Sequence, residues 1–141
     1  MKSNELLAVS YIGDAAAYAD AGAQLFNFHP SGPVYFLFCH AIELALKAYV
    51  LATGGNRKEL MPIRHDLQKL YDLATERGYK SSDPRIPEVV GWLEPHHSDF
   101  SFRYKEKTGP RSYPNPKELG EVVKILCRQI EPVTRAAFLK T

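Results

Sequence analysis

The sequence lacks most features that would assign a chain of 141 residues to a specialised class. Its two cysteines, Cys39 and Cys127, lie in apolar helical contexts and have no metal-binding spacing, so free buried thiols are favoured over a disulfide. The formal net charge is only +2, from 18 basic and 16 acidic residues, and so the overall field does not by itself favour nucleic acid or an anionic membrane. Any basic site must therefore be local.

Signals for secretion and membrane insertion are also missing. The N-terminal stretch MKSNELLAVSYIGD has no unbroken apolar region followed by a small-residue cleavage pattern. The longest apolar stretch, FLFCHAIELALKAYVLATG at residues 36–54, is interrupted by His40, Glu43 and Lys47. A membrane-spanning helix needs roughly 20 apolar residues, so we expect no such helix and a cytoplasmic protein without a membrane partner.

No strand-like alternation, internal repeat or low-complexity tract is present, whereas apolar residues recur at steps of three and four. We expect one domain over residues 1–141, an all-α antiparallel bundle of four or five helices. The expected helices cover residues 4–27, about 33–53, 66–77, a segment near 89–104 interrupted by Pro95, and a last helix from Pro116 that bends at Pro132. Stretches 28–33, 54–65 and 105–116 are expected to be loops.

The helix expected near residues 33–53 carries three titratable side chains in line. His40, Glu43 and Lys47 fall within a stripe roughly 60° wide, because each helical residue advances about 100°. The rest of the helix is apolar around most of its circumference. The stripe could be the solvent side, with Glu43 and Lys47 paired in water; a buried polar contact that fixes helix register; or part of a functional cleft.

Three segments together resemble the HEPN domain, the higher-eukaryote and prokaryote nucleotide-binding fold. They are CHAIELALKAYVLATG in the second helix, RHDLQKLYDLA at the third and FRYKEKTG after the fourth, and the likeness extends over residues 4–139. Glu43 and Lys47 match the family's second-helix Glu and Lys. His65 matches its His-x-Leu helix start, and Arg103 with Tyr104 matches its Arg-Tyr pair.

The resemblance implies a helical bundle, often a homodimer. The roles that it implies are ribonucleases of toxin and defence systems, partners of small nucleotidyltransferases or antitoxins, and inactive members that bind nucleotides or proteins. HEPN ribonucleases carry an Arg followed, after four to six residues, by a His, and no such pair occurs here. Arg57 and His65 are separated by seven residues, and His97 and Arg103 stand in the reverse order.

Cofactor and metal signatures are equally scarce. The chain has no Gly-rich phosphate loop and no Gly-Ser nucleotidyltransferase signature. His40-x-x-Glu43 is half of a bundle-type ligand pair, but no second Glu-x-x-His element accompanies it, so we expect neither a metal nor a cofactor. Bases alternate with aromatic residues between Phe100 and Tyr113; this segment suits RNA binding or is a solvated loop.

The sequence therefore predicts a HEPN-like module that binds a nucleotide or a protein and is not catalytic. Its expected ligand-binding residues are His40, Glu43, Lys47, His65 and Arg103. In that groove Lys47 and Arg103 hold a phosphate or carboxylate, Glu43 orients one of them, and a histidine supplies a titrating group. The alternative is a metal-independent ribonuclease in which Arg103 acts with His97 or His65.

Overall fold

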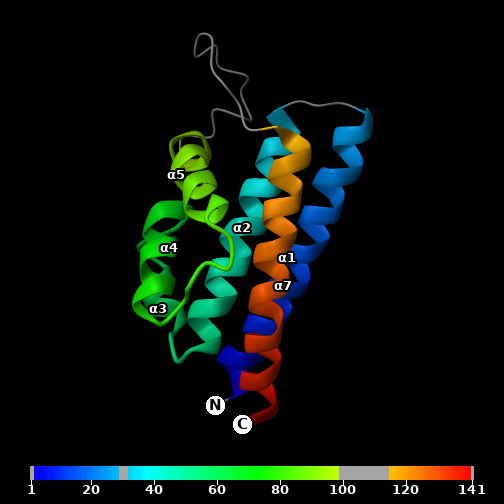
Figure 1. Ribbon diagram of the computed structural model, residues 1–141. Coiled ribbons are helices and arrows are strands. Elements are labelled where there is room, and N and C mark those ends of the chain that lie inside the picture. Colours follow the sequence, from blue (N-terminus) through cyan, green and yellow to red (C-terminus); the bar gives the residue numbers. More distant parts are fainter. Residues whose placement is uncertain (1, 29–31, 99–114, 141) are drawn as a thin grey trace.

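The computed structural model describes residues 2–28, 32–98 and 115–140, which form six helices and no strand (Figure 1). This part of the chain confirms the all-α prediction. The helices are α1 (Lys2–Phe28), α2 (Gly32–Ala52), α3 (Arg57–Leu60), α4 (Leu67–Glu76), α5 (Arg85–Ser98) and α7 (Pro116–Lys140).

Three long helices, α1, α2 and α7, pack against one another, and α2 also contacts α4 and α5 (Figure 1). The chain runs up along α1 and down along α2 and α7, so that both termini lie at the same end. Helix α2 is buried on most of its surface because nearly every residue from Val34 to Leu51 is apolar or small. It is the central helix, as its all-round hydrophobicity predicts.

Small residues allow α1 and α7 to approach the ring of Phe38 from two sides. A Cβ added at Gly22 of α1 would lie 2.7 Å from Phe38 Cε1, and one at Gly120 of α7 would lie 3.2 Å from Phe38 Cζ. Phe38 itself is 1% exposed. A Cβ at Gly22 would force the Phe38 ring to shift and one at Gly120 would make a tight contact, so both glycines allow close packing against this buried ring.

Helix α3 is a single turn that the sequence analysis assigned to a loop. Its N-cap is Asn56, whose side chain accepts from the Glu59 amide at 3.1 Å while the Glu59 carboxylate accepts from the Asn56 amide at 3.2 Å. This capping box stabilises the turn. Arg77, just after α4, then donates to Glu59 Oε1 at 2.8 Å and to the Thr53 carbonyl at 2.9 Å, which ties α3 and α4 to the end of α2.

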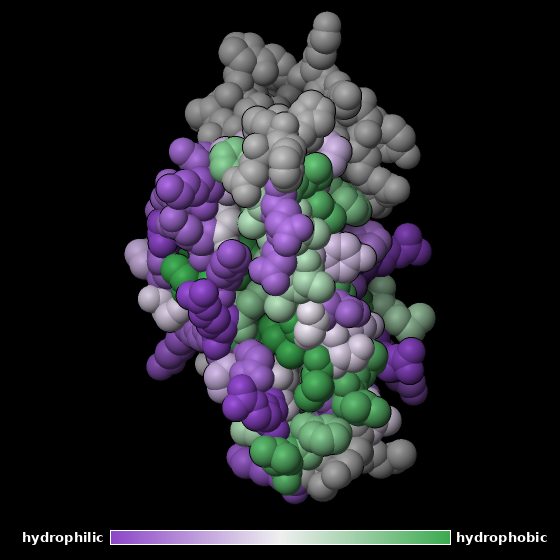
Figure 2. All heavy atoms as spheres, turned by 90° about the vertical axis from the view of Figure 1, so that its right-hand side faces the viewer, coloured by the Kyte–Doolittle hydropathy of each residue, from purple (hydrophilic) through white to green (hydrophobic). Residues whose placement is uncertain are grey.

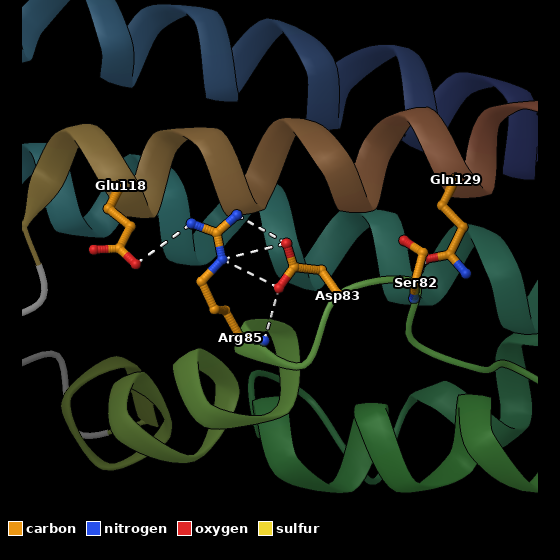
Figure 3. Close-up of polar contacts among 5 residues, drawn as sticks. All are labelled: Ser82, Asp83, Arg85, Glu118 and Gln129. Atoms are coloured by element: carbon orange, nitrogen blue, oxygen red, sulfur yellow. Dashed lines mark hydrogen bonds and ion pairs between the residues drawn. The ribbon is translucent and has the colours of Figure 1, made fainter.

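The connection between α4 and α5 is bound to α7 by polar contacts (Figure 3). Arg85 donates to Asp83 at 2.8 Å and reaches Glu118 of α7 at 3.4 Å. The Ser82 hydroxyl donates to Gln129 Oε1 at 3.2 Å. The Arg85 guanidinium lowers the pKa of the Asp83 carboxyl by donating to it. These contacts anchor the connection between α4 and α5 to α7, while α4 itself packs against α2.

The structure corrects two details of the predictions from sequence. Helix α5 continues through Pro95 to Ser98. Residues Pro33–Ala52 are, by length and composition alone, sufficient to cross a membrane, contrary to the expectation, although 67% of that window is buried inside the bundle, as it is in many core helices.

Candidate functional site

The centre of the candidate site is Glu43, a carboxylate that is 1% exposed in the middle of α2. Lys47, one turn later, donates from Nζ to Glu43 Oε2 at 2.7 Å. His65, just before α4, places Nδ1 at 3.0 Å from Oε1 and 3.1 Å from Oε2. A buried carboxylate is stable only with such partners, so two cationic or donor groups from different segments meet at one acid.

The turn before α4 brings His65 to Glu43. Arg64 has a left-handed backbone with φ +55°, its amide donates to the Leu60 carbonyl at 3.2 Å, and the Asp66 amide donates to the Ile63 carbonyl at 3.1 Å. Asp66 then caps α4 by accepting from the Lys69 amide at 3.0 Å. The chain therefore reverses tightly between α3 and α4, with His65 at the reversal.

His40 lies one turn above Glu43 but in different surroundings. Its ring packs edge-on against Tyr18 at a centroid distance of 4.5 Å and stacks on Phe36 at 5.9 Å. His40 Nδ1 is 3.9 Å from Glu43 Oε1, a weak contact compared with that of His65. Aromatic rings of α1 and of α2 itself therefore pack on His40 beside Glu43.

The neighbouring Cys39 reports on the same buried environment. Burial, and secondarily the negative Glu43, raises the pKa of the Cys39 thiol well above its usual value. Burial, and secondarily Asp20, raises the pKa of Cys127 to about 11. Both thiols are free and buried, as predicted from their helical contexts, and a protonated buried thiol is a poor nucleophile or metal ligand.

An open groove of about 690 Å³ lies where the stripe of His40, Glu43 and Lys47 on α2 reaches the surface at Lys47. Lys47 and His65 lie on its wall, with side chains that are 16% and 46% exposed. The described residues that line it are Tyr11, Lys47, Arg57, Leu60, Met61, Arg64 and His65. Four of these seven residues carry cationic or titratable nitrogen groups and none is a carboxylate, so the groove suits an anion.

Of the five predicted ligand-binding residues, the structure brings four into one cluster: His40, Glu43, Lys47 and His65. Arg103 lies outside the described residues, and the side chain of His97 is not described. The interpretation of Glu43 and Lys47 as an ion pair in solvent is wrong for Glu43, which is buried. Of the four predicted residues that the structure describes, Lys47 and His65 line the groove.

The sequence analysis missed Arg64 and Tyr11 and considered Arg57 only as part of a misplaced ribonuclease pair. A signal was available in the stretch NRKELMPIRH, where three basic residues precede His65 within nine positions. It was read as a loop by composition. The fold turns this loop into the helical turn and reversal that form one wall of the groove.

Within the described residues, no group of three or more His, Cys, Asp or Glu side chains is arranged to hold a metal ion. The aromatic and basic segment from Phe100 to Tyr113 lies outside these residues. Comparison of the chain with protein-family models, with curated proteins and with solved structures gives no match.

Proposed function

We propose that this chain is a HEPN-like module that binds a phosphate-bearing ligand, such as a nucleotide, without catalysing a reaction on it. The observation that supports the proposal is the groove lined by Lys47, Arg57, Arg64 and His65, in which no described lining residue is a carboxylate. The family assignment rests on the sequence resemblance and on its agreement with an all-helical bundle.

The buried carboxylate gives two of these groups fixed positions. Lys47 keeps further N–H donors beyond the one directed at Glu43, because an ammonium group has three. His65 is oriented by the contact of Nδ1 with both Glu43 oxygens. A ligand phosphate would therefore meet donors that are already ordered, which reduces the entropy lost on binding.

The test is calorimetric titration of the pure protein with adenosine 5′-monophosphate, comparing wild type with Lys47→Ala. The proposal predicts saturable binding that Lys47→Ala weakens by about tenfold or more, since a charge-assisted hydrogen bond is lost. Lys58→Ala is the matched control, because Lys58 is an exposed basic residue of α3 outside the groove lining. Equal loss in both variants would show only a diffuse charge effect.

A second function, a metal-independent ribonuclease, is favoured by one observation. Glu43 contacts His65 Nδ1 in the manner of a carboxylate that orients a general acid or base, and arginines line the same groove. Incubation of structured RNA with the protein in EDTA decides between the two. Cleavage that disappears in His65→Ala, Arg103→Ala or His97→Ala would establish the enzyme, and intact RNA favours the binding module.

Partners follow from the same resemblance. We propose a homodimer, and a small nucleotidyltransferase or an antitoxin as a further partner. Leu6 and Val9 of α1 are exposed, and Figure 2 shows hydrophobic side chains at the surface on the side of the molecule where α1 lies, which supports a protein contact there. Sedimentation of the wild type and of Leu6→Glu tests the dimer: loss of the dimer in the variant would place α1 in the contact.

A further inference from the structure

We infer that Arg64 is a specificity-determining residue of the groove, held in a left-handed conformation so that it and His65 together bind a terminal phosphate monoester. The inference rests on the proposed function and deepens it, because it names the ligand class: a phosphate monoester attached to a base or another flat apolar group. A nucleoside monophosphate and a phosphorylated end of RNA share this chemistry.

The backbone of Arg64 is the first support. Among the described residues, three have a clearly left-handed φ: Gly54 at +94°, Gly78 at +100° and Arg64 at +55°. The two glycines end α2 and α4, where a left-handed residue is the usual helix stop. Arg64 alone carries a side chain in this region, which its Cβ disfavours and which glycine would adopt without strain.

The position of this strained residue is the second support. Arg64 stands between Ile63 and His65 in the reversal from α3 to α4, and both Arg64 and His65 line the groove. Consecutive residues of an extended strand would point to opposite sides. The left-handed conformation breaks that alternation, so Arg64 and His65 can contribute donors to the same wall of the groove. Strained backbone conformations of this kind cluster at ligand-binding sites.

Charge defines the ligand class. The buried carboxylate of Glu43 already balances Lys47, at 2.7 Å. Arg57 and Arg64 then add two positive charges to the lining, and no carboxylate among the described lining residues offsets them. A phosphate monoester carries up to two negative charges near neutral pH and presents three oxygens, and planar guanidinium groups match it with paired hydrogen bonds. An internal phosphodiester carries one charge and offers fewer oxygens.

The apolar part of the lining completes the match. Tyr11 comes from α1, and Leu60 and Met61 come from the end of α3, so that the groove has an aromatic ring and aliphatic surface beside its basic wall. Met61 is an exposed large hydrophobic residue, at 73%. Aromatic and thioether groups are suited to contact the face of a base.

Titration calorimetry of the full chain tests the inference with three probes: adenosine 5′-monophosphate, adenosine 3′,5′-cyclic monophosphate and adenosine. We expect the monoester to bind about tenfold or more tightly than the cyclic diester, and adenosine to bind most weakly. A short oligoadenylate with and without a 5′-phosphate shows whether the natural ligand is a free nucleoside monophosphate or a phosphorylated end of RNA. Tighter binding of the phosphorylated oligomer than of the free nucleotide would assign the site to RNA ends.

Two variants of Arg64 separate ligand binding from folding. Arg64→Gly relieves the backbone, so we expect a melting temperature equal to or above that of the wild type, together with a loss of affinity for the monoester of about tenfold. Arg64→Asn, which tolerates the left-handed region, should behave in the same way. Lys58→Ala should change neither quantity.

The outcomes distinguish the inference from the proposed function. If the wild type binds the monoester and the cyclic diester equally, or if Arg64→Gly binds as tightly as the wild type, the inference is wrong while the phosphate-binding module stands. If the wild type binds none of the probes, both are overturned. If Arg64→Gly melts at a markedly lower temperature than the wild type, the Arg64 side chain stabilises the fold. Its assigned role as a strained ligand-binding residue is then contradicted.

Discussion

His65 Nδ1 lies within 3.1 Å of both carboxylate oxygens of Glu43, a residue 22 positions earlier in the chain. The contact joins the central helix α2 to the turn that opens α4. Glu43 is almost fully buried, whereas His65 is 46% exposed at the groove. One acid thus stabilises the packing of the turn on α2 and, at the same time, fixes a group on the wall of the candidate site.

Removal of the Glu43 carboxylate should reduce stability substantially. Glu43→Ala leaves Lys47 and His65 without their acceptor and creates a small cavity, so we expect a loss of about 2–4 kcal/mol in the free energy of unfolding. Urea denaturation followed by circular dichroism measures this change. Glu131→Gln is the control, because Glu131 forms an exposed pair with Arg135 on α7 at 3.0 Å, and it should change stability by less than about 0.5 kcal/mol. Equal effects would contradict a special role for Glu43.

Two glycines of α1 should respond to alanine in opposite directions. At Gly22 the new Cβ would lie 2.7 Å from the buried ring of Phe38, so Gly22→Ala should destabilise the protein by about 1–3 kcal/mol. At Gly13 the Cβ meets nothing within 4 Å, so Gly13→Ala should stabilise it by about 0.5–1 kcal/mol through helix propensity. Thermal melts of the two variants measure the contrast, and the same sign for both would show that α1 does not pack as described.

Tyr79 should make the protein sensitive to alkali. Burial raises its pKa from the usual 10 to about 12, and its hydroxyl donates to Gln129 Oε1 of α7 at 2.9 Å. The unfolded chain ionises from about pH 10 and the folded chain only near pH 12, so stability falls as the pH rises through this window. Denaturation at pH 8 to 11 should show a flatter pH dependence for Tyr79→Phe than for the wild type. Parallel curves would contradict the assignment.

The long helices were predictable from sequence because their signals are local. Apolar spacing gave α2, α4 and α7 within a few residues, and Asn115 does accept from the Lys117 amide at the start of α7, at 2.9 Å, as its position before Pro116 predicts. Glu43, Lys47 and His65 were also predicted from sequence to lie in one groove. In the structure Lys47 and His65 both contact the Glu43 carboxylate, from α2 and from the turn before α4.

The groove itself could not be read from the sequence. Its lining depends on a single helical turn at Arg57 and on the left-handed Arg64, and both arise where composition indicates an ordinary loop. The surroundings of His40 also depend on tertiary structure, because its ring packs against Tyr18 of α1 as well as against Phe36. Periodicity locates helices and their faces, but it does not give the conformation of the turns between them.

Nuclear magnetic resonance of the imidazole and backbone signals during titration with adenosine 5′-monophosphate tests the central claim most directly. If the groove binds phosphate, the His65 ring and the amides of Lys47 and Arg64 should show saturable shifts, with little change at Gly13 or Arg135. In Arg64→Gly, whose fold is retained, the same shifts should need about tenfold more ligand. Shifts confined to other surfaces, or none at saturating ligand, would contradict the assignment of this groove as a phosphate site.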